Sequence, residues 1–473
     1  MKDLKKYWFT IALVGIFVVA VGLRLYKVTA PVSDWHSFRQ VDTASVARIF
    51  VTDGIDVLHP RYHDLSNIQS GKDNPHGYRM VEVPLYQAAA TMLVRMMPFL
   101  SVDIALRIIT IIASALTAVL LAVIASVLIT PLAGISAGFL YAILPYSVFY
   151  GRVVLAEPLA VFFAISSIFL MMKTSFFLSV ICASLSILIK PTAGFLLLPL
   201  GGLMILQYKF SLQLFARAAI AALITIVPFL WWRQWILQYK EGIPVFLWLL
   251  NDGNIRFKGA WFHWLFAERV SKLILGYWGV VFVGLGITLK LDKKEKWVPP
   301  LLLLGSIAYL VIFAAGNVRH DYYQILLLPV ICLYAGKGIA YLLTNTNFSR
   351  VASITFLVVG IGFTTAFSWF HMRTYYWINR PEIIMAGIEA DRILPKDAKV
   401  IAPYNGDTTF LYQTKRTGWP LGFDIDKKLA QGATHYVTVS PTDADWETKT
   451  LAETYTVLVR NDTFAIIDLT KPK

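Results

Sequence analysis

Cysteine, charge and repetition are all scarce in this chain of 473 residues. Its two cysteines, Cys182 and Cys332, both lie within apolar runs, so the sequence offers neither a disulfide framework nor a cysteine-ligated metal site. Charged residues form 15% of the chain and apolar residues 57%, whereas soluble domains contain about 25% and about 45 to 50%. Internal repeats and low-complexity segments are lacking too. This composition argues against an ordinary soluble enzyme.

The charges that are present are mainly basic and lie in the apolar part of the chain. Lys and Arg outnumber Asp and Glu by 43 to 29, which gives a formal net charge of +14. From Thr374 to the C-terminus, 12 basic residues accompany 13 acidic ones, so residues 1–373 carry the whole excess. A basic balance suits nucleic acid, a membrane surface or an anionic substrate. Because the excess belongs to the apolar part, the sequence predicts a membrane protein without a nucleic-acid partner.

Many apolar runs have the length of a transmembrane helix, which is about 20 residues. The first run follows Lys2, Lys5 and Lys6; its length and the lack of a small-residue cleavage site favour a retained anchor over a signal peptide. The three lysines predict a cytoplasmic N-terminus. About eleven spans are predicted in all: 7–28, 104–129, 133–150, 158–172, 176–189, 193–207, 214–232, 273–289, 298–315, 326–343 and 353–370.

The apolar stretch 84–100 is ambiguous. It contains Arg95, a Met-Met pair and a proline, so we interpret it as an interfacial helix rather than a span. Eleven crossings then place the basic linkers on the cytoplasmic side, as the positive-inside rule requires; these linkers hold Lys173, Lys209, the run 290–296 and Arg350. The same parity sends three longer hydrophilic segments outward, namely 29–83, 233–271 and the chain after residue 371.

The tail, residues 372–473, differs in character from the transmembrane module, residues 1–371. Its charge density is higher, and its apolar runs shorten to 399–402, 434–439 and 455–459, with turn signals between them. A helix is predicted at 381–394, ahead of the first strand. The sequence therefore predicts that the tail is a small α/β domain on the extracytoplasmic side.

Polar side chains crowd the start of the first outer loop, directly after a predicted span. Asp34, His36, Arg39, Gln40 and Asp42 follow one another closely, and apolar residues then recur at helical spacing. Asp34 thus sits at a predicted helix start, where an N-cap is the ordinary explanation. The crowding favours instead a site for a polar ligand that arrives from the lipid.

Charged residues also mark the end of this loop and the next outer turn. Arg79 and Glu82 precede the interfacial helix, where the helix dipole explains Glu82 equally well. Arg152 and Glu157 lie between two apolar spans, and a charge at membrane depth costs about 2.5 to 3.5 kcal/mol. The two can compensate each other structurally, yet such groups are functional candidates by default.

Two further outer turns carry charged residues. Lys190 begins a span, where snorkelling to the headgroups is the ordinary explanation. Another turn contains Arg319, His320, Asp321 and Tyr322, although tyrosines are common at a membrane interface. Taken together, these turns bring acids and bases from distant parts of the chain to one face of the membrane. This coincidence favours a single pocket at the outer border of the bilayer.

The order of these motifs along the chain resembles a known family. A helix at 36–48 follows the first span, and then come Glu82-Val-Pro-Leu-Tyr86, Gly151-Arg152 with Glu157-Pro158, Lys190-Pro-Thr, and His320-Asp-Tyr-Tyr323 before an apolar span. The chain is similar in this order, over nearly its whole length, to the polytopic transferases of the GT-C fold that use polyprenyl-phosphate sugars. That family includes protein O-mannosyltransferases and the lipid A aminoarabinose transferase. The resemblance implies a polytopic α-helical membrane protein of GT-C type with a small α/β extracytoplasmic domain.

The resemblance also implies roles for the acids. In that family the general base is an acidic residue of the first outer loop, and a second acid, matched here by Glu157, lies in the next one. The usual Asp-Glu pair of the family helix falls on Arg39 and Gln40 in this chain, which leaves Asp34 or Asp42 as the base. We favour Asp34, which lies nearest the membrane, with Asp42 as a partner for an arginine.

The implied reaction is an inverting sugar transfer from a polyprenyl phosphate to a lipid, glycan or protein acceptor on the outer face of the inner, or plasma, membrane. A carboxylate takes the acceptor's proton while the anomeric carbon is attacked from the opposite face. The departing phosphate needs cations, for which the candidates are Lys190, Arg152, Arg79 and Arg319. The other substrate-binding candidates are His36, Arg39, Gln40, Glu82, His320, Asp321 and Tyr322. No cofactor is expected; a divalent ion held by Asp34 and Glu157 is the open alternative.

A transporter or flippase of lipid-linked sugars is the second hypothesis, because intramembrane charges suit it equally. A transporter is expected to show repeat symmetry and spans broken by Gly or Pro in matching halves. The sequence shows neither. The long first loop and the outer α/β domain favour the transferase.

Overall fold

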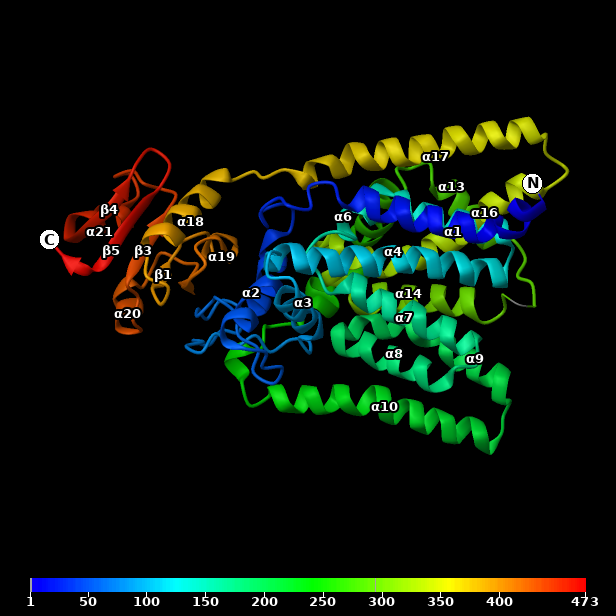
Figure 1. Cartoon of the computed structure of the whole chain (residues 1–473), viewed down its shortest axis with the longest axis horizontal. Helices are drawn as coiled ribbons and strands as arrows, with labels where there is room; N and C mark the ends of the chain where they lie inside the picture. The colour runs from blue at the N-terminus through cyan, green and yellow to red at the C-terminus, as the bar shows by residue number, and fades with distance from the viewer. Residues whose placement is uncertain (1, 294) are drawn as a thin grey trace. The chain divides into compact units, whose positions relative to one another are not determined.

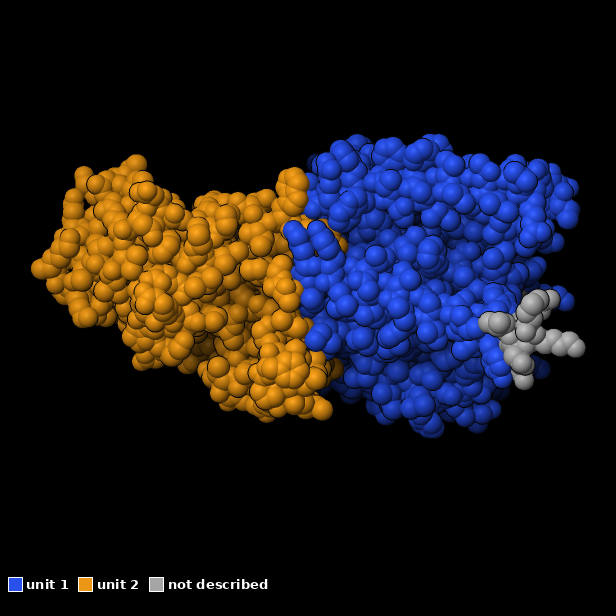
Figure 2. Space-filling model, turned by 45° about the horizontal axis from the view of Figure 1, so that its top comes forward, with its two compact units in different colours: residues 1–28, 107–232, 246–375 blue, residues 29–106, 233–245, 376–473 orange. Residues whose placement is uncertain are grey.

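The computed structural model describes residues 2–293 and 295–473. Met1, and Lys294 within the predicted cytoplasmic linker, lie outside the described residues. The chain divides into two compact units, which Figure 2 shows in different colours. Unit 1 comprises residues 1–28, 107–232 and 246–375, and unit 2 comprises residues 29–106, 233–245 and 376–473.

Helices make up the whole of unit 1 (Figure 1). The short α11 (Trp248–Asn251), α12 (Gly259–Phe262) and the π-helix η4 (His263–Ile274) lie between its longer helices. Two 3-10 turns, η1 (Pro191–Leu197) and η5 (Asp321–Leu327), run directly into the helices that follow them. The other helices are α1 (Lys2–Arg24), α4 (Val102–Leu128), α5 (Pro131–Ile143), α6 (Pro145–Tyr150), α7 (Glu157–Met172), α8 (Phe176–Ile189), α9 (Leu198–Tyr208), α10 (Leu212–Ile236), α13 (Val280–Thr288), α14 (Val298–Ile312), α15 (Ala314–Arg319), α16 (Leu328–Thr344) and α17 (Arg350–Met372).

Membrane-spanning character is clear from the lengths and composition of these helices. Within the described residues, six helices are long and apolar enough to cross a membrane, and shorter apolar helices accompany them. The chain is therefore a multi-pass membrane protein. Each of the eleven predicted spans coincides with helical structure, while the number of crossings itself stays a prediction.

The predicted span 133–150 is two helices rather than one. Helix α5 ends at Ile143 and α6 begins at Pro145, because a proline has no N–H to donate to the carbonyl four residues back. That carbonyl belongs to Tyr141, and it accepts instead from Arg24 Nη2 at 3.1 Å and from Ser147 Oγ at 2.7 Å. Pro145 thus causes the break between the two helices, and the side chains of Arg24 and Ser147 supply the hydrogen bonds that the break leaves unmade.

Helix α16 forms the centre of unit 1, since its residues from Leu328 to Ala340 are all buried. Helix α13 packs against it through glycines. A Cβ on Gly286 would lie 1.9 Å from the carbonyl oxygen of Tyr334, and one on Gly338 would lie 2.2 Å from that of Phe282. Only glycine permits so close an approach of two helix backbones.

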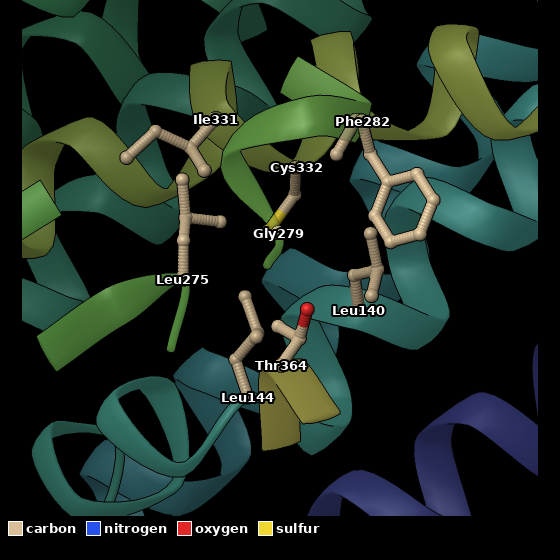
Figure 3. Close-up of a pocket in the computed structure, with 9 residues that line it drawn as sticks. Leu140, Leu144, Leu275, Gly279, Phe282, Ile331, Cys332 and Thr364 are labelled. Carbon is tan, nitrogen blue, oxygen red and sulfur yellow. The ribbon is translucent and has the colours of Figure 1, made fainter. Parts of the chain in front are cut away.

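A small apolar cavity lies beside α16 (Figure 3). Its volume is about 10 Å³, which is the space of a single water molecule at most. The cavity is therefore a gap in the packing and too small for a sugar or a prenyl chain. It is lined by Leu140, Leu144, Leu275, Gly279, Phe282, Ile331, Cys332, Ala335 and Thr364.

Unit 2 combines the first outer loop with the C-terminal part of the chain. The loop contains α2 (Ser37–Asp53) and α3 (Leu85–Met96). The C-terminal part consists of α18 (Pro381–Ile393), β1 (Lys399–Ile401), α19 (Thr409–Gln413), β2 (Thr417–Trp419), α20 (Ile425–Ala430), β3 (His435–Thr438), α21 (Trp446–Thr454), β4 (Tyr455–Arg460) and β5 (Ala465–Pro472). The five strands form one sheet in the order β2-β1-β3-β5-β4, in which β1, β2 and β3 are parallel and β5 is antiparallel to both its neighbours. Figure 1 labels β1, β3, β4 and β5 of this sheet.

Both faces of this sheet are covered by apolar side chains, and its β2 edge is covered by the first outer loop. Val400 packs with residues of α18 and α19 on one face, and Tyr436 packs with residues of α21 on the other. At the edge, Leu65 N donates to Gly418 O at 2.8 Å and Gly418 N donates to His63 O at 2.9 Å. The loop therefore blocks an edge strand that would otherwise be open to pairing.

The sequence predictions for unit 2 are largely confirmed. Helix α18 and strands β1, β3 and β4 lie where a helix and three strands are predicted, and α3 lies within the predicted interfacial helix 84–100. Strands β2 and β5 are missing from the prediction. The short Thr-Gly-Trp segment of β2 contains a glycine, which is depleted in strands, and the last three of the eight residues of β5 are exposed.

Candidate functional site

Asp34 lies ahead of α2, and its carboxylate is held by a side chain of that helix. Gln40 Nε2 donates to Asp34 Oδ1 at 2.7 Å and to the carbonyl of Trp35 at 3.0 Å. Asp34 is 5% exposed. The expectation that Asp34 sits at the helix start is wrong: α2 begins at Ser37, because His36 adopts a left-handed conformation with φ of 56° that a right-handed helix does not contain. An N-cap role therefore does not explain Asp34.

Asp42, the alternative base, has both carboxylate oxygens engaged. Its Oδ2 lies 2.9 Å from Arg79 Nη2 and accepts from Gln69 Nε2 at 2.9 Å. Its Oδ1 accepts from Thr408 Oγ1 at 2.8 Å. The predicted arginine partner is thus present and is Arg79. Asp42 is thus held by three side chains, and the choice of Asp34 over Asp42 as the base stays a prediction.

Glu82 pairs with Arg39 in the same loop. Arg39 Nη2 donates to Glu82 Oε1 at 2.8 Å, and both side chains are largely buried. The ion pair joins the chain just before α3 to the first turn of α2, which begins three residues after Asp34. His36 lies edge-on to the rings of Trp35 and Phe38. The loop residues predicted as a group therefore do occur together, within unit 2.

The C-terminal part of the chain also holds the segment around Asp34, which the sequence does not reveal. Thr409 Oγ1 bonds to Ser37 Oγ at 2.9 Å, and Gln413 Nε2 donates to the carbonyl of Val32 at 3.0 Å. Thr408 bonds to Asp42 from the same short segment. These three residues, 408, 409 and 413, form what we call the α19 clamp. The clamp fixes the backbone on both sides of Asp34.

Glu157 and Lys190 form a buried ion pair in unit 1. Lys190 Nζ lies 2.8 Å from Glu157 Oε1, and Glu157 is fully buried. Within the described residues, the second oxygen, Oε2, is buried and has no hydrogen-bond partner. Glu157 opens α7, and Lys190 is placed between α8 and η1 because Pro191 ends the α-helical hydrogen bonding there. Charged residues within a membrane are functional candidates, and in this pair the Oε2 atom of Glu157 can still accept a hydrogen bond.

Two buried arginines organise the turn that leads to Glu157. Arg24 is fully buried and donates to the carbonyls of Tyr141, Ala142 and Ser147, as well as to two serine hydroxyls. Arg152, also fully buried, donates from Nη1 to the carbonyl of Lys27 at 2.8 Å. Arg24 is not among the predicted site residues, although an arginine inside the first apolar run is a visible signal.

Asp321 sits in a cage of tyrosines within unit 1. Its Oδ1 accepts from Tyr150 at 2.5 Å, its Oδ2 accepts from Tyr375, and its carbonyl accepts from Tyr146. Arg269 Nη1 lies 3.9 Å from Oδ2. Arg269 comes from the π-helix η4 and was not among the predicted residues.

The neighbours of Asp321 in the sequence have separate environments. Arg319 forms an ion pair with Asp252 and is half exposed. His320 lies edge-on to Trp248, with ring centroids 5.7 Å apart, and Tyr322 is buried. All four cations predicted for the phosphate have partners in the structure: Arg79 and Arg319 pair with aspartates, Lys190 pairs with Glu157, and Arg152 bonds to the carbonyl of Lys27.

The predicted site residues therefore form two groups. Asp34, His36, Arg39, Gln40, Asp42, Arg79 and Glu82 lie in unit 2, whereas Arg152, Glu157, Lys190, Arg319, His320, Asp321 and Tyr322 lie in unit 1. Each group is internally paired as described. The convergence of both groups on one pocket stays a prediction.

Asp64 is a buried acid of unit 2 whose pKa is raised by its surroundings. It is 1% exposed and accepts from the Ser66 amide at 2.8 Å and from the Tyr62 hydroxyl at 3.3 Å. Burial raises the pKa of Asp64 from 3.8 to about 6, and the nearby charge of Asp42 acts in the same direction. The folded protein therefore holds a proton on Asp64 at pH values where the unfolded chain has lost it.

We expect Asp64→Asn to flatten the pH dependence of stability between pH 4 and pH 6. A raised folded-state pKa stabilises the protein fully below the unfolded-state pKa, and this contribution falls as pH rises through the folded-state pKa. The wild-type protein should thus lose about 2 kcal/mol from this group between pH 4 and pH 6. Apparent Tm in detergent, measured across this range, checks the expectation, with the exposed Asp426→Asn as control. An unchanged slope in Asp64→Asn would contradict it.

No family model and no curated protein matches the chain. Among solved structures, it is similar to ArnT from Cupriavidus metallidurans bound to undecaprenyl phosphate, with 11% identity, a TM-score of 0.64 and coverage of 97% of each chain. It is also similar to the archaeal oligosaccharyltransferase AglB from Archaeoglobus fulgidus in complex with an inhibitory peptide and a dolichol-phosphate, with 11% identity, a TM-score of 0.58 and coverage of 98% of this chain and 74% of that one. This likeness confirms the predicted fold class: the chain has the GT-C fold.

Proposed function

We propose that the chain is an integral-membrane glycosyltransferase that moves a sugar, with inversion, from a polyprenyl phosphate to a glycan, lipid or protein acceptor on the extracytoplasmic face. The likeness over 97% of both chains to a structure that holds undecaprenyl phosphate carries this proposal. The acid and the ion pair that the reaction requires are present in the two units. No observation favours the transporter alternative.

Asp34 is the general base in this proposal. It removes the proton of the acceptor hydroxyl, the acceptor oxygen bonds to the anomeric carbon, and the bond from that carbon to the phosphate oxygen breaks. Gln40 supports this role because its amide fixes one oxygen, Oδ1, and so orients the carboxylate. The products are the glycosylated acceptor and the polyprenyl phosphate.

Lys190 is the leading cation for the departing phosphate. A lysine at membrane depth needs a counter-charge, and Glu157 provides it at 2.8 Å. Fixed positive charge aimed at a leaving phosphate stabilises the transition state most effectively in a site that excludes water. Glu157 Oε2 is then available to accept from a hydroxyl of the donor sugar. Arg152 is the second candidate cation.

The proposed location is the inner, or plasma, membrane, with the N-terminus in the cytoplasm and the C-terminal part outside. Lipid-linked sugars for envelope glycans would then meet their acceptors on the outer side. A reporter enzyme fused after Lys473 tests the orientation. Activity of a reporter that works only in the cytoplasm would overturn it.

A transfer assay with purified protein tests the proposed reaction. The protein in detergent is given undecaprenyl-phosphate-linked sugars and an envelope extract as acceptor, and free undecaprenyl phosphate is measured by mass spectrometry. We expect sugar to leave one of these donors only when the acceptor is present. In parallel, the envelope glycans of cells that lack the protein should lose one sugar. Intact glycans together with no turnover would refute the proposal.

A further inference from the structure

The C-terminal sheet has an edge of the kind that binds ligands in α/β proteins. Strands β1, β2 and β3 are parallel, so their carboxyl ends meet at one edge. From β1 the chain continues to β2 on one side, whereas from β3 it continues to β4 on the other side. Such a reversal between neighbouring strands opens a crevice in which open α/β sheets bind their ligands. We call the three segments that follow these strands, residues 402–408, 420–424 and 439–445, the edge loops.

Two aromatic rings are exposed at this edge. Phe423, in the loop after β2, is 55% exposed, and Trp446, directly after the loop of β3, is 71% exposed. The residues that precede them lie near the hydroxyl of Tyr436: a Cβ on Gly422 would lie 3.6 Å from that hydroxyl, and Asp445 is close enough to interact with it electrostatically. The two rings therefore belong to one surface.

The loops that present these rings are ordered by their own hydrogen bonds. The buried Lys428 donates from Nζ to the carbonyl of Leu421 at 3.0 Å and also to that of Phe423. On the other side, the carboxylate of Asp445 caps α21 by accepting from the Thr448 amide at 3.0 Å. An apolar ring that stays exposed to solvent contributes little to the stability of the fold, even though the loop that carries it is ordered. The Nζ of Lys428 also lies 5.0 Å from the centroid of the Phe423 ring. The exposed part of this ring and the Trp446 ring are open to a partner.

The polar groups beside the rings define the chemistry of that partner. The edge loops contain four acids, Asp407, Asp424, Asp443 and Asp445, and no Lys, Arg or His. Cations from neighbouring segments offset much of this charge, since Arg460 pairs with Asp443 at 2.6 Å and Lys428 bonds to the loop after β2. The surface thus suits a neutral ligand better than a charged one. Exposed hydroxyl and amide groups are present at Asn405, Ser440 and Thr442. A neutral saccharide complements such a surface, because its C–H faces stack on aromatic rings and its hydroxyls bond to acids, amides and hydroxyls.

The edge is continuous with the segment that holds Asp34. The loop after β1 begins at the sheet edge with Ala402 and ends in the α19 clamp, where Thr408 and Thr409 bond to Asp42 and Ser37. A ligand at the edge is therefore one loop away from the segment of the general base. Of the substrates of the proposed transfer, the acceptor is the one that must reach the general base, so it is the ligand expected at this edge.

We propose that the carboxyl edge of the C-terminal sheet binds the saccharide part of the acceptor, which stacks on Phe423 and Trp446. The proposal rests on the transferase function proposed above and names the class of its acceptor as a neutral glycan. The C-terminal part then has two tasks: it binds the acceptor chain through the edge loops and it holds the Asp34 segment through the α19 clamp.

Saccharide binding by the full chain tests this site without requiring turnover. The protein is held in an amphipol that contains no sugar, and neutral tetrasaccharides of glucose, galactose, mannose, rhamnose and N-acetylglucosamine are tested one by one by saturation-transfer NMR and calorimetry. We expect at least one of them to bind, and we expect Trp446→Ala and Phe423→Ala each to weaken binding at least tenfold. Trp377→Ala is the matched control, because Trp377 is a similarly exposed aromatic residue of unit 2 outside the edge loops; it should bind normally.

The outcomes separate this site from the transferase proposal. If the acceptor site and the transferase function are both correct, Trp446→Ala raises the KM for the acceptor and leaves kcat nearly unchanged. If the transferase proposal fails, the tetrasaccharide still binds and depends on the two rings, but no donor is consumed. Turnover with no tetrasaccharide bound, or with binding unaffected in both ring variants, overturns the acceptor site. Binding of anionic phospholipid vesicles that depends on the rings would overturn it in favour of a membrane contact.

Discussion

Asp34→Asn is expected to lower kcat for sugar transfer by at least about 10²- to 10⁴-fold, which is the contribution of a general base. An amide cannot take the proton of the acceptor hydroxyl. The fold should tolerate the change, since the carbonyl oxygen of an asparagine can still accept from Gln40 in place of Oδ1. Donor binding should therefore remain, while release of polyprenyl phosphate from the loaded donor stops.

Asp42→Asn is the matched control for this prediction. Asp42 bonds to Arg79, Gln69 and Thr408, so its substitution should lower the apparent Tm of the protein but leave a measurable kcat. Gln40→Leu gives a further comparison, because it removes the donor that orients Asp34 and should alter the pH profile of kcat. Full activity of Asp34→Asn, or loss of kcat only in Asp42→Asn, would move the base to Asp42.

The sequence predicts the helical framework well because apolar runs of membrane length have few alternatives. The predicted span 176–189 coincides with α8, and the predicted span 158–172 differs from α7 by one residue. These segments need only local information, namely composition and length. The break at Pro145 also has a local cause, although its repair by Arg24 depends on a distant helix.

The pairing of charged residues is predicted less well because it depends on contacts between distant segments. Glu157 has Arg152 nearby in the sequence, yet its ion-pair partner is Lys190, which the fold brings to 2.8 Å. Arg269 and the α19 clamp were missed for the same reason: nothing in their local sequence indicates that they bond to Asp321 or to the Asp34 segment. Residue type and spacing thus predicted many of the charged side chains of the candidate site, but not which of them form ion pairs with each other.

Arg24 has the largest expected effect on stability. Removing its side chain leaves the carbonyls of Tyr141 and Ala142 without its hydrogen bonds at the break between α5 and α6, where Pro145 cannot supply a donor. Bonds from a charged donor contribute about 1.5 to 3 kcal/mol each, and buried polar groups that lose their partners cost more. We therefore expect Arg24→Met to destabilise the protein by more than about 3 kcal/mol.

A drop in apparent Tm of at least about 5 °C in detergent, or loss of the monodisperse protein, would show this effect. Arg373→Met is the control, because Arg373 is exposed on unit 1 and contacts the ring of Phe370; it should change Tm little. Gly151→Ala provides an independent test of the same contact, since a Cβ there would lie 2.4 Å from Arg24 Nε and 2.5 Å from Ser114 Oγ. If both Arg24→Met and Gly151→Ala melt like the wild type, the arginine does not hold the break. If both variants are destabilised, the turn from α6 to Glu157 depends on the buried side chain of Arg24 in the first membrane helix. The position of the ion pair between Glu157 and Lys190 then depends on Arg24 as well.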